Sequence, residues 1–174
     1  MRILTWAFFA TLSLILMLQL RGLDEPLQTN DTRGIVAYEL AWSGARADAI
    51  ITDWRTNDAI EPAKVSLGVD FAFLLAYPLM FATGVGLLVR AASTGVFDRT
   101  GRVLNRAVLA CIPLDAAENL LLWRMLDHGA SDPLAHLATV CAALKFTLVI
   151  MTALWCVAAL GRRVTSSSTP RPLN

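Results

Sequence analysis

The chain contains few cysteines and none of the short motifs that bind metals or nucleotides. Its three cysteines lie in apolar segments, without a CxxC pair and without histidines at metal-binding spacing. Thiol redox chemistry and zinc binding are therefore not expected. The sequence also lacks a Gly-rich phosphate loop, a nucleophile elbow and an HExxH motif. We expect no metal and no cofactor.

The chain also lacks an excess of charge of either sign. It has 15 basic and 14 acidic residues, and 13 of the basic residues are arginines that are scattered along the sequence without interleaved aromatic residues. A nucleic-acid-binding domain usually carries a basic patch or stripe. Nucleic acid is therefore not an expected partner.

Apolar sequence is what the chain has in excess. Hydrophobic residues make up 56% of its 174 residues and the mean hydropathy is +0.55, whereas ordinary soluble domains are about 45–50% apolar. Four segments approach or exceed the roughly 20 residues that a helix needs to cross a hydrocarbon core. We predict an all-α protein, a four-helix transmembrane bundle in contact with membrane lipids. The predicted spans are about residues 3–20, 65–89, 103–126 and 134–160.

We expect one membrane domain, residues 1–164, followed by a short polar tail. The first apolar segment follows only Met1 and Arg2 and lacks small residues at a cleavage site, so a retained helix is favoured over a signal peptide. Residues 165–174 are rich in Ser and Pro and are expected to form a disordered cytoplasmic tail.

The distribution of basic residues predicts the orientation of the bundle. With four spans, the N-terminus, the loop at residues 90–106 and the tail share one side and carry eight arginines. Residues 21–64 and 127–133 lie on the other side and carry five basic and ten acidic residues. Because cytoplasmic loops are enriched in Lys and Arg, we expect both termini in the cytoplasm.

Residues 21–64 are expected to form an extracytoplasmic insertion between the first two spans. Within it, residues 34–54, GIVAYELAWSGARADAIITDW, have apolar residues at helical spacing and are predicted to form one helix. The exposed face of this helix carries charges of both signs rather than a row of lysines. We expect it to cap the bundle. A position in the membrane interface, where Trp and Tyr are favoured, is the alternative.

Four ionisable residues fall well inside the predicted spans, and Arg124 lies near the outer end of the third span. An insertion scale makes Asp, Lys or Arg unfavourable by roughly 2.5–3.5 kcal/mol near a helix centre, so such residues should face the bundle interior and contact one another. Counted along their helices, all four lie in the central-to-outer half of the membrane. They are Asp70, Asp115, Glu118 and Lys145.

Other polar and aromatic residues are expected to complete this layer. Asn119 is one helical turn from Asp115, and Tyr77 is two turns from Asp70, so each shares a helix face with an acid. Residues of the predicted outer helix could close the layer from above. The residues that would orient the acids or bind a ligand are Glu39, Trp42, Trp54, Tyr77, Asn119 and Lys145.

Two interpretations of the layer are open. A buried acid–lysine pair, with its remaining lone pairs satisfied by neighbours, could serve only to fix how the helices pack. Three carboxylates facing one lysine leave at least one carboxylate without a partner, however. Excess buried acid is typical of a site that handles protons or binds a ligand. We favour a functional cavity in which Asp70, Asp115 and Glu118 are the catalytic acid–base groups.

The chain contains the stretches YELAWSGARADAIITDW, LGVDFAFLLAYP and LDAAENLLLW, followed by a lysine-bearing last helix. Together these resemble a family of small bacterial four-span integral membrane proteins that has no assigned function. The resemblance covers about residues 34–160 and implies a location in the bacterial inner membrane and one recurring polar pattern. It implies no substrate. In layout alone, the chain is also similar to the EXPERA proteins, which are sterol isomerases and their ligand-binding relatives.

Three functions are compatible with this layer. The favoured function is a pocket for a small lipid-like or cationic ligand, with acid–base isomerase or cyclase chemistry that needs neither metal nor nucleotide. The first alternative is a proton- or cation-coupled transporter, which with four spans would need a homo-oligomer. The second is an accessory subunit whose polar cluster is purely structural. A dead-end pocket open to lipid would favour the ligand-binding function. A path to both faces of the membrane would favour the transporter, and a filled bundle would favour the structural subunit.

Overall fold

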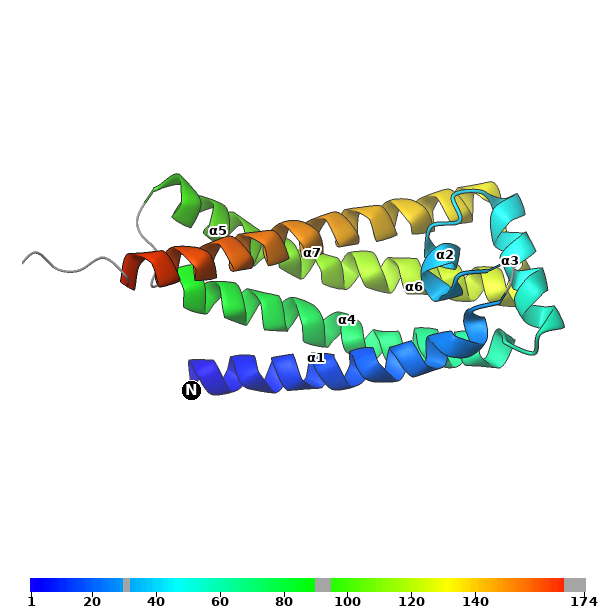
Figure 1. The fold of residues 1–174 in the computed structure, drawn as a ribbon. Coiled ribbons are helices and arrows are strands. Elements are labelled where there is room, and N and C mark those ends of the chain that lie inside the picture. Colours follow the sequence, from blue (N-terminus) through cyan, green and yellow to red (C-terminus); the bar gives the residue numbers. More distant parts are fainter. Residues whose placement is uncertain (30–31, 90–94, 168–174) are drawn as a thin grey trace, which may run out of the picture.

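Long helices packed side by side dominate the computed structural model, which describes residues 1–29, 32–89 and 95–167 (Figure 1). The described residues form no strand, and their only β-type pairing is an isolated bridge between Gln28 and Arg33. The predicted all-α class is confirmed. The long helices are α1 (Arg2–Asp24), α4 (Ile60–Val89), α6 (Cys111–His128) and α7 (Asp132–Ser167).

Three helices in the described part of the chain are long and apolar enough to cross a membrane. They begin at Arg2, Ile60 and Asp132, and the mean hydropathies of their apolar 18-residue segments are 2.0, 2.0 and 2.1. The predicted third span, residues 103–126, is not one helix. It is divided among α5 (Val96–Ala107), the 3-10 turn η2 (Val108–Ala110) and α6. The reason is that α5 is strongly amphipathic, with three arginines on its polar side, whereas α6 is largely apolar around its acids.

The long helices form two antiparallel pairs. Helix α1 packs along α4, α6 packs along α7, and α4 joins the pairs because it contacts both α6 and α7. Among the described residues, α1 packs closely only on α4 and on the short turn η1 (Glu25–Leu27) that follows it. The N-terminus, α5 and the end of α7 lie at one end of the bundle, here called the terminal end (Figure 1).

The opposite end, here called the cap end, is covered by the residues between α1 and α4. Residues 34–54 were predicted as one helix, but they form α2 (Gly34–Glu39) and α3 (Gly44–Thr56), with a break at residues 40–43. Trp42 in this break has a positive φ of 61°. Both helices lie across the ends of the long helices (Figure 1), with contacts to α7 from each of them.

Contacts with α7 explain the break. The backbone N–H of Trp42 donates to Thr139 Oγ1 at 3.0 Å, and the backbone N–H of Gly44 donates to Asp132 Oδ1 at 2.7 Å. Thr139 Oγ1 also donates to the carbonyl of Glu39 at 2.9 Å. Side chains of α7 therefore satisfy backbone groups that a continuous helix would have bonded internally.

Three apolar clusters form the core among the described residues. The cap cluster includes Leu27, Tyr38 and Trp54, and the middle cluster is built on Leu74, Tyr77, Val108 and Cys111. The terminal cluster comprises Val85, Leu88, Leu104, Trp155 and Ala159 and joins α4, α5 and α7. Helix α7 continues through Ser167, so the predicted disordered tail at residues 165–174 begins as helix, and residues 168–174 lie outside the described residues.

Candidate functional site

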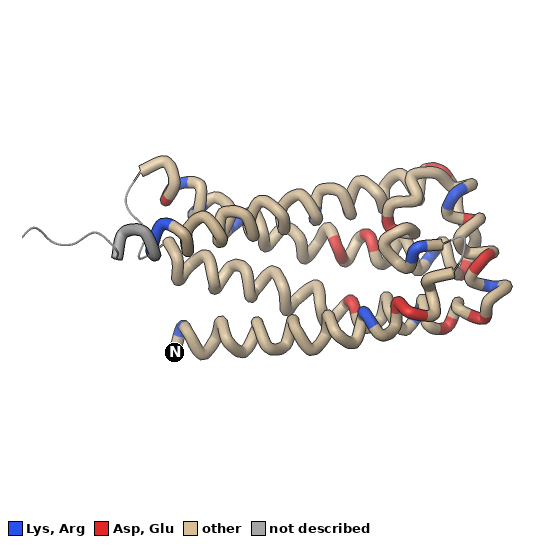
Figure 2. The backbone as a smooth tube through the Cα atoms, in the orientation of Figure 1, with Lys and Arg blue, Asp and Glu red and all other residues tan. Residues whose placement is uncertain are grey.

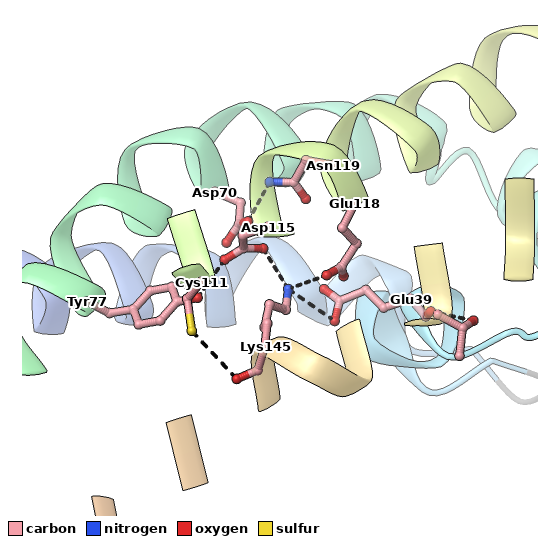
Figure 3. Close-up of polar contacts among 9 residues, drawn as sticks. Glu39, Asp70, Tyr77, Cys111, Asp115, Glu118, Asn119 and Lys145 are labelled. Carbon is pink, nitrogen blue, oxygen red and sulfur yellow. Dashed lines mark hydrogen bonds and ion pairs between the residues drawn. The ribbon is translucent and has the colours of Figure 1, made fainter. Parts of the chain in front are cut away.

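The ammonium group of Lys145 on α7 lies among three carboxylates. Its Nζ is 2.7 Å from Asp115 Oδ1, 3.0 Å from Glu118 Oε2 and 3.8 Å from Glu39 Oε2 (Figure 3). Helix α6 supplies Asp115 and Glu118, and α2 supplies Glu39. Each of the four side chains is at most 10% exposed. We call Glu39, Asp115, Glu118 and Lys145 the lysine cluster.

Two hydrogen bonds extend the lysine cluster to α4. The Tyr77 hydroxyl donates to Asp115 Oδ2 at 2.9 Å, and the Asn119 amide donates to Asp70 Oδ2 at 2.6 Å (Figure 3). Asp115 is therefore held at both oxygens, by Tyr77 and by Lys145. The helical spacing of Asp115 and Asn119 turns both side chains toward α4, as the sequence predicts.

Carboxyl groups outnumber cations at this site. Four carboxyls, including that of Asp70, lie near one ammonium, whereas the side chain of Arg124, near the outer end of α6, is exposed. Glu118 Oε1 and Glu39 Oε2 are buried and accept no hydrogen bond from the described residues. Burial raises the pKa of the Glu39 carboxyl above its ordinary value, and this effect outweighs the opposing attraction of Lys145.

A cavity of about 510 Å³ lies beside the lysine cluster, between α1, α2, α4, α6 and α7. Pockets for small molecules usually measure about 300–1,000 Å³ and are mostly apolar with a few convergent polar groups. This cavity has that composition, because most of its lining residues are aliphatic or aromatic and its few polar side chains converge on one space. Its acidic, basic, amide and phenol groups are Glu39, Asp70, Tyr77, Asp115, Asn119 and Lys145.

The cavity opens at the side of the bundle. Leu14 and Met17 of α1 line it and are each 51% exposed, and α1 does not pack closely on α7 across the gap. Ile35 and Val36 of α2 cover it at the cap end. Toward the terminal end, the middle and terminal clusters fill the described part of the bundle. The cavity is thus a pocket with a lateral opening.

Six of the nine residues predicted for the site line this cavity, and three do not. Glu118 is fully buried behind Lys145 and is not part of the cavity wall. Trp42 is 58% exposed and packs on His136, with 4.9 Å between ring centroids. Trp54 is fully buried in the cap cluster, where its indole N–H donates to the carbonyl of Leu27 at 3.0 Å. The two tryptophans therefore do not close the polar layer from above.

Ser13 of α1 is a cavity residue that sequence reasoning missed. It is 5% exposed, and its Oγ has no hydrogen-bond partner among the described residues. The hydroxyl of a serine in an apolar helix commonly donates a hydrogen bond to a carbonyl of its own helix. The sequence around Ser13 therefore carries no functional signal. Only the unpaired oxygen beside the cavity distinguishes Ser13 from an ordinary helix serine.

The arrangement places acid–base groups against an apolar space. A general acid or base must lie within hydrogen-bond reach of its substrate. Asp70 and Asp115 meet this requirement because both line the cavity, whereas Glu118 could act only through Lys145 or by positioning it. Tyr77 and Asn119 fix the orientation of the two cavity carboxyls.

Comparison of the chain with protein-family models, with curated proteins and with solved structures gave no match. The function is therefore inferred from the geometry of the cavity and of the lysine cluster.

Proposed function

We propose that this is an integral membrane protein with four transmembrane helices, α1, α4, α6 and α7, whose lateral cavity binds a small lipid-like molecule. The length and hydropathy of α1, α4 and α7 support this placement. Helix α6 has 18 residues and would rise about 27 Å, close to the thickness of a hydrocarbon core. Its polar face meets α4 and α7, and its opposite face offers apolar side chains such as Leu120, 62% exposed, to lipid.

The charges at the two ends support a cytoplasmic location for both termini. Figure 2 shows acidic residues gathered at the cap end, whereas the terminal end carries mainly arginine. Asp98 is the one acidic residue of α5, and it pairs with Arg102. Because cytoplasmic segments are enriched in Lys and Arg, the terminal end belongs in the cytoplasm and the cap end outside.

Cysteine labelling tests this orientation. In a variant whose three native cysteines are replaced by alanine, Thr56→Cys on α3 and Thr100→Cys on α5 each introduce a thiol at an exposed position. A membrane-impermeant thiol reagent is expected to label Thr56→Cys in intact bacterial cells, and to label Thr100→Cys only after the membrane is permeabilised. The reverse pattern would show that the termini lie outside, and labelling of both in intact cells would rule out a membrane between them.

The lateral opening of the cavity is the observation that carries the proposed function. An amphiphile could move in from the bilayer between α1 and α7, with its apolar part against Leu14 and Met17 and its polar part at Asp70 and Asp115. The packed clusters toward the terminal end offer no polar path, which favours binding over transport. The unfilled space beside the lysine cluster favours a binding role over a purely structural one. Isomerisation or cyclisation of the bound molecule by the cavity carboxyls is compatible with this site.

A bulky residue at the mouth of the cavity should reduce ligand binding. Leu14→Trp places an indole at the cavity wall, and Leu18→Trp is its matched control, because Leu18 is 57% exposed on the same helix but does not line the cavity. Native mass spectrometry of protein purified in mild detergent is expected to show a co-purified lipid on the unsubstituted protein and on Leu18→Trp, and at least about fivefold less of it on Leu14→Trp. Equal retention by all three proteins, or no bound molecule on any of them, would contradict the proposed function.

A further inference from the structure

We infer that the ligand of this cavity is a cationic amphiphile, whose positively charged amine is bound by Asp70, Glu39 and the hydroxyl of Ser13. This inference rests on the proposed function, because it specifies the chemical class of the molecule that the same cavity binds. Three groups of observations support it. They concern the partners of the carboxyls, the unpaired hydroxyl of α1 and the aromatic rings of the cavity wall.

Lys145 does not pair closely with two of the three carboxyls that line the cavity, those of Asp70 and Glu39. Its shortest contacts, 2.7 and 3.0 Å, go to Asp115 and Glu118. Glu39 Oε2 is 3.8 Å from Nζ and accepts no hydrogen bond from the described residues, and Asp70 Oδ2 accepts a hydrogen bond from the neutral amide of Asn119. Lys145 is also the only cationic side chain among the cavity residues of the described chain. A second cation would therefore find two carboxyls in the cavity wall that are not closely paired with a positive charge.

Ser13 supplies an independent polar group on the opposite helix. Its buried Oγ faces the cavity from α1 and has no hydrogen-bond partner among the described residues. A buried hydroxyl without a partner loses the hydrogen bonds it makes in water, which is unfavourable by about 1–3 kcal/mol. An ammonium N–H in the cavity could donate to this oxygen while donating its other protons to Asp70 and Glu39.

The aromatic lining favours a cation over other head groups. Phe73, Tyr77 and Phe146 line the cavity on the side of the acids, and a cation near an aromatic face gains about 0.5–2 kcal/mol. Phe146 already contacts the Lys145 ammonium, which lies 5.1 Å from its ring centroid. An anionic head group would instead meet the excess of carboxyls, and Lys145 is already surrounded by three of them. The remaining apolar walls suit an alkyl or polycyclic body.

Three probes of equal chain length test the charge of the ligand. Dodecylamine, dodecanol and dodecanoate are added at equal membrane mole fractions to the full chain in phosphatidylcholine nanodiscs, and binding is measured by native mass spectrometry and by the shift in thermal unfolding temperature. We expect dodecylamine to bind at least about tenfold more tightly than dodecanol, and dodecanoate to bind most weakly. Equal binding of amine and alcohol, or tighter binding of the carboxylate, would overturn the cationic assignment while leaving a lipid-binding pocket. If none of the probes binds, the proposed function itself fails.

Single substitutions test the named residues. Asp70→Asn and Glu39→Gln should each weaken dodecylamine binding about tenfold and dodecanol binding much less, and Ser13→Ala should weaken dodecylamine binding about threefold. Matched controls are Glu61→Gln and Thr147→Ala, which remove an exposed carboxylate and an exposed hydroxyl outside the cavity. Equal losses for amine and alcohol would indicate damaged packing and would contradict the assignment. If a variant does not fold, the comparison of the three probes on the unsubstituted protein still decides the question.

Discussion

Lys145→Met is expected to lower the free energy of unfolding by about 3–5 kcal/mol, because it leaves buried carboxylates without their cation. Asp115 and Glu118 are at most 2% exposed, and both lie within 3.0 Å of Lys145 Nζ. Methionine is unbranched and close in length to lysine, so the substitution removes the charge with little change in volume. The midpoint of thermal unfolding of the purified protein in detergent would measure the loss.

Lys64→Met is the matched control for Lys145→Met. Lys64 Nζ lies 2.7 Å from Asp127 Oδ1, as close as Lys145 lies to Asp115, but these two side chains are 28% and 33% exposed. An exposed ion pair contributes little to stability, so we expect little change in the unfolding midpoint. Adding Asp115→Asn and Glu118→Gln to Lys145→Met should restore part of the loss, because neutral groups need no cation. Equal effects of the two lysine substitutions, or no recovery in the triple variant, would show that the cluster is not held by its charge pairing.

Trp54→Ala is expected to lower the free energy of unfolding by about 3–5 kcal/mol. Trp54 is fully buried in the cap cluster, and its ring packs edge-on against Tyr38 with 5.1 Å between centroids. The substitution would leave a cavity and would also leave the carbonyl of buried Leu27 without the indole N–H that bonds it. Thermal unfolding and protease resistance of residues 32–56 would report the loss, since α2 and α3 depend on this packing.

Trp42→Ala is the matched control, because Trp42 lies in the same cap but is 58% exposed. We expect it to change stability by less than about 1 kcal/mol. Neither tryptophan lines the cavity, so Trp42→Ala should also leave lipid retention unchanged in native mass spectrometry. A large loss of stability in Trp42→Ala, or a small one in Trp54→Ala, would contradict this description of the cap. A loss of bound lipid in Trp42→Ala would favour the ligand-binding role that the sequence predicted.

The sequence alone determined the helical class and the polar face of α6. Both depend on local patterns, namely long apolar runs and the spacing of Asp115, Glu118 and Asn119, which puts three polar side chains on one face of any helix they form. The position of Lys145 near these acids also follows from the sequence, because a buried ion without a counter-charge is strongly unfavourable.

Only the tertiary structure decided where the cap helix breaks, which tryptophan is buried and which polar groups face the cavity. The backbone groups at Trp42 and Gly44 are satisfied by Thr139 and Asp132, which lie 97 and 88 residues away in the chain. Ser13 became a candidate only because, among the described long helices, α1 packs closely on α4 and leaves its Oγ beside an open space. Such outcomes depend on contacts between segments that are distant in sequence, and no local pattern of residues encodes them.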